Sequence, residues 1–176
     1  HCVRGHAVND PHRKIGEESE FPIVAIDYTY FGESAMERKE RKERMKKGDR
    51  DDTERGMPIL AVCDNKLGYR AADLVPEKGE NHFAIKRLSE IIQGLGYRKI
   101  IFKSDQEFNI CALKRAVRRE CGDVEFIMEE SPVGEHQSNG RIENCIRQLQ
   151  GTFRAMKDAL EARLGEKING DSWSVP

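Results

Sequence analysis

The sequence predicts a mixed α/β domain, in which a five-stranded sheet is flanked by helices. Three short apolar runs typical of strands come first, and later segments alternate helical spacing with two further strand-like runs. The expected order is therefore β, β, β, α, β, α, β, α. Strands in series form an antiparallel meander, whereas strand–helix–strand units add parallel strands. A chain of 176 residues is long enough to build this around one core.

The composition indicates a soluble, highly charged protein. Charged residues make up 35% of the chain and hydrophobic residues 38%, yet the formal net charge is only -1. Any nucleic-acid surface must therefore come from local clusters of basic residues. No apolar run approaches the roughly 20 residues that a membrane span needs, and no signal-peptide pattern opens the chain. We expect no membrane partner and no secretion.

The cysteines favour a reducing compartment. They are five in number and scattered, with no CxxC pair, which argues against a disulfide framework and a self-contained zinc site. They stand at Cys2, Cys63, Cys111, Cys121 and Cys145.

Two segments flank the expected core, which spans residues 21–165, and a third is inserted into it. Residues 1–20 are polar and rich in histidine, so we expect a linker or the tail of a preceding module, and residues 166–176 are expected to be a truncated C-terminal linker. Residues 33–57 form a charged insertion without an apolar face. A solvated loop is the favoured interpretation, and contact with DNA through "RKERKERMKK" is the alternative.

The first three strands are expected to form the meander. "FPIVAID" (21–27) is a short apolar run with β-branched residues, typical of a buried strand, and it ends on Asp27. "PILAVCD" (58–64) and "YRAADLVP" (69–76) flank "NKLG", which predicts a hairpin.

The later elements alternate helix and strand. A helix is expected after Gly79, with its stop signal at Gly94 and Gly96. Its apolar positions are Ala84, Leu88, Ile91, Ile92 and Leu95. "YRKIIFKSD" (97–105) predicts a strand ending on Asp105. After it come a helix with Ile110, Leu113 and Val117 and the strand "VEFIME" (124–129).

The last helix is expected to start near Asn139 and to carry two stripes. One is apolar and faces the core or a partner, and it comprises Ile142, Ile146, Leu149, Phe153, Met156, Leu160 and Leu164. The neighbouring stripe is polar and comprises Glu143, Arg147, Gln150, Arg154 and Lys157.

Two aspartates at strand ends predict a metal site. A right-handed crossover can place the fourth strand beside the first, so Asp27 and Asp105 would lie side by side. Like charges at close range are costly unless a cation joins them, and carboxylate oxygens are the ligands that Mg²⁺ or Mn²⁺ prefers. Glu143 is a third candidate ligand. Its alternative role is purely local, because a carboxylate near a helix N-terminus gains about 0.3–1 kcal/mol.

Four motifs carry a resemblance to a known family. "AIDYT", "AVCDNKLGY", "IFKSDQEFN" and "GEHQSNGRIEN" resemble the catalytic core of retroviral and retrotransposon integrases, the DDE members of the RNase H-like superfamily. Their order and context cover about residues 21–164. The resemblance implies an RNase H-like fold and a polynucleotidyl transferase whose Asp27, Asp105 and Glu143 hold two Mg²⁺ or Mn²⁺ ions. The implied reactions are processing of 3' DNA ends and their joining to target DNA.

The resemblance also implies DNA contacts around the last helix. The family's loop before the glutamate matches residues 132–140, its DNA-contacting polar position matches Asn139, and a basic position matches Arg147. Arg154 and Lys157 would add phosphate contacts. For the three basic residues, a solvated helix face remains the alternative.

The sequence departs from the family pattern in two ways around the site, and the charged insertion at 33–57 is also longer than in retroviruses. The interval from Asp105 to Glu143 is longer by two residues, and Glu107 follows where Asn-Gly is usual, as an outer partner of the metals or an exposed residue. "HCVRG" resembles the end of the family's zinc module, with Cys2 as its last ligand. Without the upstream ligands, Cys2, His6 and His12 close no tetrahedral site, so zinc is not expected here.

The sequence therefore predicts a metal-dependent retrotransposon-type integrase core. The family also implies a homo-oligomer on DNA that acts in the nucleus after travelling in a cytoplasmic particle. Two alternatives stay open: an RNase H-like nuclease with the same fold and metals, and a decayed or domesticated relic that binds DNA without chemistry.

Overall fold

The computed structural model describes residues 19–30, 57–131 and 140–168. The elements are β1 (Ile23–Thr29), β2 (Ile59–Asp64), β3 (Arg70–Leu74), α3 (His82–Gly94), β4 (Lys99–Ser104), α4 (Phe108–Glu120), β5 (Glu125–Glu130) and α5 (Gly140–Leu164). Their order is the one that the sequence predicts. The expected N-terminal tail, the charged insertion, the loop before α5 and the C-terminal linker lie almost wholly outside the described residues.

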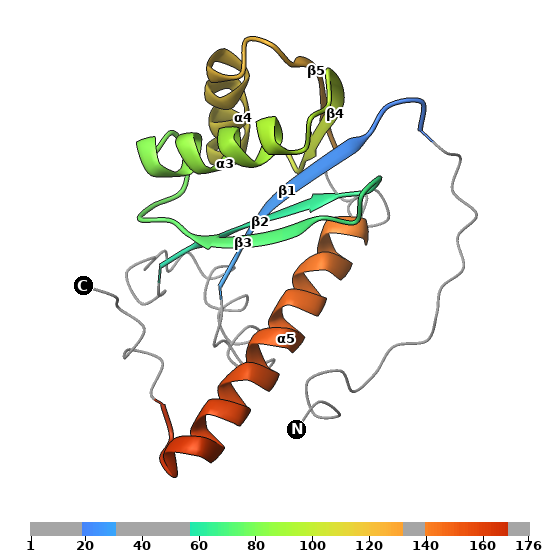
Figure 1. Ribbon diagram of the computed structural model, residues 1–176. Coiled ribbons are helices and arrows are strands. Elements are labelled where there is room, and N and C mark those ends of the chain that lie inside the picture. Colours follow the sequence, from blue (N-terminus) through green and yellow to red (C-terminus); the bar gives the residue numbers. More distant parts are fainter. Residues whose placement is uncertain (1–18, 31–56, 132–139, 169–176) are drawn as a thin grey trace, which may run out of the picture.

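The sheet has the strand order β3-β2-β1-β4-β5. β1 pairs with β2 and β2 with β3 in antiparallel fashion, whereas β4 is parallel to both β1 and β5. Helices α3 and α4 cover one face of the sheet and α5 crosses the other (Figure 1). The predicted architecture, a mixed five-stranded sheet with a three-strand antiparallel meander, parallel strands and helices packed on it, is confirmed.

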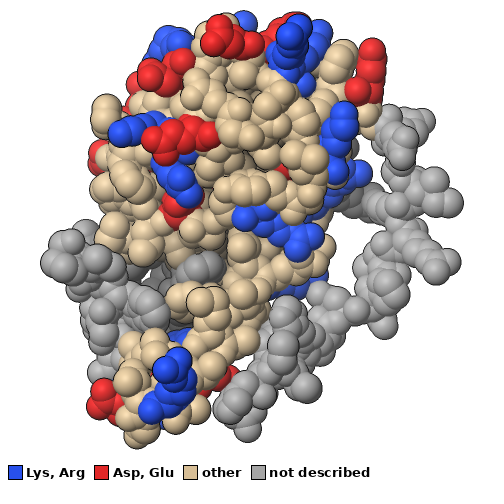
Figure 2. Space-filling view, in the orientation of Figure 1, with Lys and Arg blue, Asp and Glu red and all other residues tan. Residues whose placement is uncertain are grey.

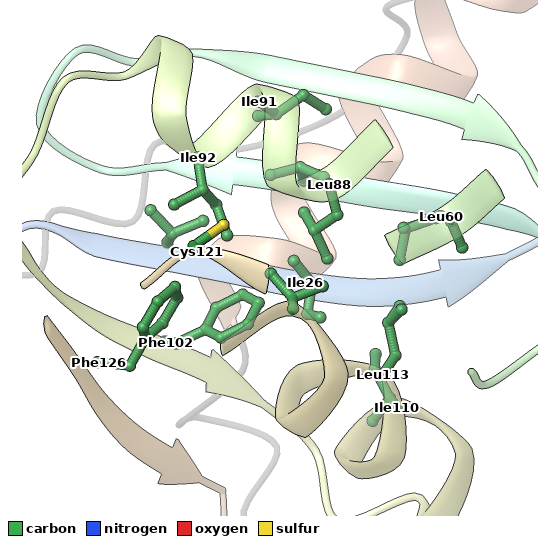
Figure 3. Close-up of a cluster of buried hydrophobic side chains, with 14 of the residues drawn as sticks. Ile26, Leu60, Leu88, Ile91, Ile92, Phe102, Ile110, Leu113, Cys121 and Phe126 are labelled. Carbon is green, nitrogen blue, oxygen red and sulfur yellow. The ribbon is translucent and has the colours of Figure 1, made fainter. Parts of the chain in front are cut away.

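The main core lies between the sheet and the pair α3 and α4. Alternate residues of β1, including Val24 and Ile26, are fully buried there, as the two-residue period of a strand requires. They meet Leu88 of α3 and Leu113 of α4 (Figure 3). Side chains of this size stabilise the fold by roughly 1.5–3 kcal/mol each when fully buried.

The opposite face of the sheet is lined by small residues where α5 crosses. Ala25 and Ala61 form a second buried cluster with Ile142 and Cys145 of α5. Alanine leaves room for the helix to approach the strands closely. The second half of the helix does not share this burial, since Met156 and Leu164 are 67% and 55% exposed. The predicted apolar stripe is therefore core-facing only in its first turns.

One strand end differs from the prediction. β1 does not stop at Asp27 but runs two residues further, because Tyr28 and Thr29 pair with Leu60 and Ile59 of β2. Tyr28 is also buried in the main core. Asp27 therefore lies within the strand, where its backbone is held by pairing with Ala61 of β2.

Asp64, the last residue of β2, has a structural role. Its carboxylate accepts hydrogen bonds from the N–H groups of Lys66 and Leu67, at 3.3 and 2.6 Å, and from the hydroxyl of Tyr97 at 3.0 Å. Together with the positive φ of Gly68 (71°), these bonds shape the turn between β2 and β3. Asp64 is 1% exposed, so it is closed to an outside ligand.

None of the helices in the described part of the chain has the length and apolar character that a membrane span requires.

Candidate functional site: carboxylates on β1 and β4

Asp27 and Asp105 lie on neighbouring parallel strands. The register pairs Ala25 of β1 with Lys103 of β4. Two residues further along each strand, Asp27 stands opposite Asp105, which follows β4 directly. The structure thus brings together the two aspartates that the sequence predicts to be side by side.

Asp27 faces the same side of the sheet as α5. Ala25 and Thr29, which share its face by the two-residue period, both contact this helix. Ala25 packs in the cluster with Ile142, and Thr29 Oγ1 lies 3.1 Å from the donor Gln150 Nε2. The polar stripe of α5 that contains Gln150 therefore contacts β1 at Thr29, two residues after Asp27.

The surroundings of Asp27 raise its pKa to about 7. Burial is the largest cause, followed by the negative charge of Asp105, and Glu107 adds to the effect. A hydrogen bond from the N–H of Tyr28, at 2.7 Å, and the charge of Lys78 act in the opposite direction. A carboxyl group that keeps its proton near neutral pH lies where its negative charge is unfavourable. A bound cation would be stabilised at such a place.

Asp105 is held by the turn between β4 and α4. Its Oδ1 accepts a hydrogen bond from the N–H of Glu107 at 3.1 Å, and its carbonyl oxygen accepts one from Ser104 Oγ at 2.7 Å. Ser131 N–H bonds to the carbonyl of Ser104 at 2.9 Å and continues the ladder. These bonds fix the direction in which Asp105 leaves the strand.

A lysine beside the aspartates was not predicted from the sequence. Lys78 Nζ donates to both carboxylate oxygens of Glu107, at 2.8 and 3.0 Å, and lies 5.3 Å from the ring centroid of Tyr28. The next residue, Gly79, donates its N–H to the hydroxyl of Tyr28 at 3.0 Å. Positions 78 and 107 are 29 residues apart and follow different strands, so no local pattern signals their pairing.

Lys78 determines how much free negative charge Glu107 brings to the site. Glu107 is neither fully exposed nor a free extra charge, because its side chain is 35% exposed and paired with a lysine that is 22% exposed. Much of the negative charge that it brings to the aspartates is therefore compensated locally. Glu107 is thus not merely exposed, and its role as an outer partner of bound metal ions stays a prediction.

Glu143 is in the first turn of α5 and is exposed. It is not among the main causes of the raised pKa of Asp27. Within the described residues, no three histidine, cysteine, aspartate or glutamate side chains come together closely enough to hold a metal ion. The structure therefore assembles two of the three predicted carboxylates. Glu143 nevertheless lies two helical turns before Gln150, on the stripe that touches Thr29.

The basic residues of α5 differ in their surroundings. Arg147 and Arg154 are exposed. Lys157 is half-buried, with its Nζ 3.7 Å from Glu161 Oε1, so part of its charge is used within the helix. Asn139 lies outside the described residues. On the face shown in Figure 2, acidic and basic side chains are interspersed over the region of α3 and α4 rather than gathered into one basic patch.

The donor set suits a hard divalent cation. Asp27 and Asp105 offer carboxylate oxygens on neighbouring strands, and the raised pKa of Asp27 reflects the cost of its burial and, second, of the negative charge of Asp105. Such a cost is offset by a bound Mg²⁺ or Mn²⁺ ion. The candidate zinc ligands Cys2, His6 and His12 are outside the described residues.

Comparisons with known proteins concern the fold. No protein-family model matches the sequence, and no curated protein matches it. Among solved structures, the chain is similar to the catalytic core domain of BIV integrase, with a TM-score of 0.45 and 14% identity over 78% of this chain and 72% of that one. It is also similar to a chain of the simian T-cell lymphotropic virus intasome in complex with PP2A regulatory subunit B56 gamma. In that case the TM-score is 0.37 and the identity 15%, over 70% of this chain and 38% of the other.

Proposed function

We propose that the chain is the catalytic core of a retrotransposon-type integrase, a divalent-metal-dependent polynucleotidyl transferase. The observation that carries the proposal is the β1–β4 register, which sets Asp27 opposite Asp105 on the face of the sheet crossed by α5. Both side chains are only partly buried, in contrast to Asp64, which is 1% exposed and whose carboxylate is used within its own turn.

In this proposal Asp27 and Asp105 bind the cations, and Glu143 completes the site when the first turn of α5 approaches them. Bound divalent ions would supply activation of the attacking hydroxyl and stabilisation of the leaving oxygen during displacement at phosphorus. Lys78 and Glu107 hold the Asp105 turn and Tyr28 in position. Arg147 and Arg154, exposed on the same helix as Glu143, are suited to phosphate contacts that orient DNA without reading its sequence. A second subunit and a nuclear place of action belong to the same proposal.

The proposal is tested by titrating Mn²⁺ calorimetrically into the wild type and the variants Asp27→Asn, Asp105→Asn and Glu143→Gln. Nicking and strand-transfer assays on duplex DNA use the same proteins. We expect metal binding in the wild type, and a loss of nicking in each variant that exceeds the roughly 10–100-fold typical for removal of an outer partner of a metal ligand. Glu120→Gln, an exposed change at the far end of α4, is the matched control and should leave both readings unchanged.

The principal alternative is a relic that binds DNA without cutting it, and the distance of Glu143 from the aspartate pair is the observation in its favour. It predicts that wild type and Glu143→Gln bind metal equally weakly and leave DNA intact. A ribonuclease H-like nuclease predicts cleavage of an RNA–DNA hybrid without joining of DNA ends. The three functions therefore give different products in one set of assays.

A further inference from the structure

Two cysteines that are far apart in the sequence meet where α5 lies on the sheet. Cys63 belongs to β2 and Cys145 to α5, and both are part of the small cluster around Ala25 and Ala61. Their thiols lie within hydrogen-bonding reach of each other. Cys145 is 2% exposed, and its Sγ is also 3.8 Å from the carbonyl oxygen of Val62.

The two thiols differ in access to solvent. Cys63 is only half-buried, so a small oxidant can reach it, whereas Cys145 is enclosed behind it. The pKa of the Cys63 thiol is lowered to about 7, first by the hydrogen bond with Cys145 and further by the charges of Arg70 and Arg141. An accessible thiolate beside a second, protected thiol is the usual arrangement of a redox-sensitive pair.

We propose that Cys63 and Cys145 form a reversible disulfide that joins β2 to α5 when the protein meets a peroxide. The Cys63 thiolate attacks one peroxide oxygen, the O–O bond breaks, and hydroxide leaves, which gives a sulfenic acid. The Cys145 thiol then attacks the sulfenic sulfur, the S–S bond forms, and the oxygen leaves as water. Two thiols are oxidised by two electrons, and the peroxide is reduced to water.

The disulfide would act on the helix that carries Glu143. Cys145 is two residues after Glu143, so a bond from it to β2 fixes the first turns of α5. In the order β2-β1-β4, strand β2 lies on the side of β1 away from Asp105. Oxidation therefore holds the first turns of α5, and Glu143 with them, close to β2 and away from Asp105. This restraint reduces metal-dependent nicking. This consequence for activity rests on the proposed function, whereas the disulfide itself does not.

The test treats the full chain, first reduced, with hydrogen peroxide, and then alkylates the remaining thiols. Mass spectrometry of the intact protein should show the loss of two alkylatable thiols, and digestion without reductant should yield the Cys63 and Cys145 peptides joined. Dithiothreitol should restore both thiols. Cys63→Ser and Cys145→Ala should each abolish the linkage, and either one suffices if the other fails to fold. Cys111→Ser, a change at another half-buried thiol, should form the linkage as the wild type does.

Three results overturn the proposal: a linkage between two chains instead of within one, conversion of Cys63 to sulfinic acid while Cys145 is still alkylated, and an unchanged linkage in Cys63→Ser. Nicking measured on the same samples is read separately. If the linkage forms but reduced and oxidised proteins nick DNA equally, the restraint on Glu143 is refuted. If neither form nicks DNA, the proposed function fails while the thiol chemistry is still decided by the peptide map.

Discussion

At the scale of single residues, the candidate site is a balance of charges around a strand. Asp27 is destabilised as an anion by burial and by Asp105, and Lys78 reduces this cost only in part because it is paired with Glu107. The sequence identified both aspartates, since each stands at the end of an apolar run. It could not identify Lys78, because this lysine reaches Glu107 through tertiary structure alone.

The raised pKa of Asp27 predicts an unusual dependence of stability on pH. Between pH 4 and 7 the unfolded chain has lost the Asp27 proton while the folded protein retains it, since the pKa rises from 3.8 to about 7. The contribution of Asp27 to the free energy of unfolding is therefore complete below pH 4 and is lost as the pH rises through 7. Each pKa unit corresponds to about 1.4 kcal/mol, so the loss amounts to a few kcal/mol at most.

The variant Asp27→Asn removes this contribution. In urea unfolding without divalent ions, the variant should gain stability relative to wild type as the pH rises from 4 to 7, and should be the more stable of the two at pH 8. Asp123→Asn, at an exposed turn position, is the control and should show no such trend between pH 5 and 8. If the difference in the free energy of unfolding between wild type and Asp27→Asn stays constant from pH 4 to 8, the raised pKa of Asp27 is contradicted.

At the scale of elements, α5 is held on the sheet by a small buried contact in its first turns. Its first turns bury Ile142 and Cys145 against two alanines, while its later turns leave Met156 largely exposed. Helical periodicity predicted one long apolar stripe, because spacing reports which residues share a face but not how far a sheet extends beneath them. The strand lengths show the same limit. β1 continues beyond Asp27 because β2 supplies partners, and a single strand carries no record of its neighbour's length.

Ala61→Leu should displace α5. Ala61 is fully buried beneath the helix, and added methylene groups in such a position cost about 1–3 kcal/mol. We expect a lower urea midpoint and faster hydrogen exchange in α5 than in α4. Leu67→Ala, a change at a residue that is 65% exposed in the turn between β2 and β3, should leave both unchanged. Equal acceleration of hydrogen exchange in α4 and α5 would show that the contact at Ala61 does not hold α5 separately from the rest of the fold.

At the scale of the whole molecule, the order of elements and the sheet topology follow from the sequence. Three strands in series must form a meander, and the right-handed crossover leaves the fourth strand only one place beside the first. A place for Glu143 beside the aspartates does not follow from this topology, because the sequence before α5, with "HQSNG" at 136–140, carries no periodic pattern. The pair of aspartates was thus predictable from topology, and the third carboxylate was not.

The core between the sheet and the helices α3 and α4 should govern global stability. Leu113→Ala removes a fully buried side chain and should lower the free energy of unfolding by about 2–5 kcal/mol. Phe108→Ala, on the same helix at a position that is 78% exposed, should cost far less. Urea denaturation of both variants checks this. A smaller loss for Leu113→Ala than for Phe108→Ala would mean that α4 is not part of the core.

The last rung of the ladder between β1 and β2 gives the chain freedom to change its length. Thr29 and Ile59 face each other there, so the segment between them leaves and rejoins the sheet at a single point. Once both anchors are fixed, doubling the length of such a connection costs only about 0.6 kcal/mol. The position can therefore accept insertions and deletions of very different size while Asp27, two residues before the anchor, keeps its place. The fold provides, directly beside its candidate catalytic aspartate, a site at which new sequence can be acquired without loss of the sheet.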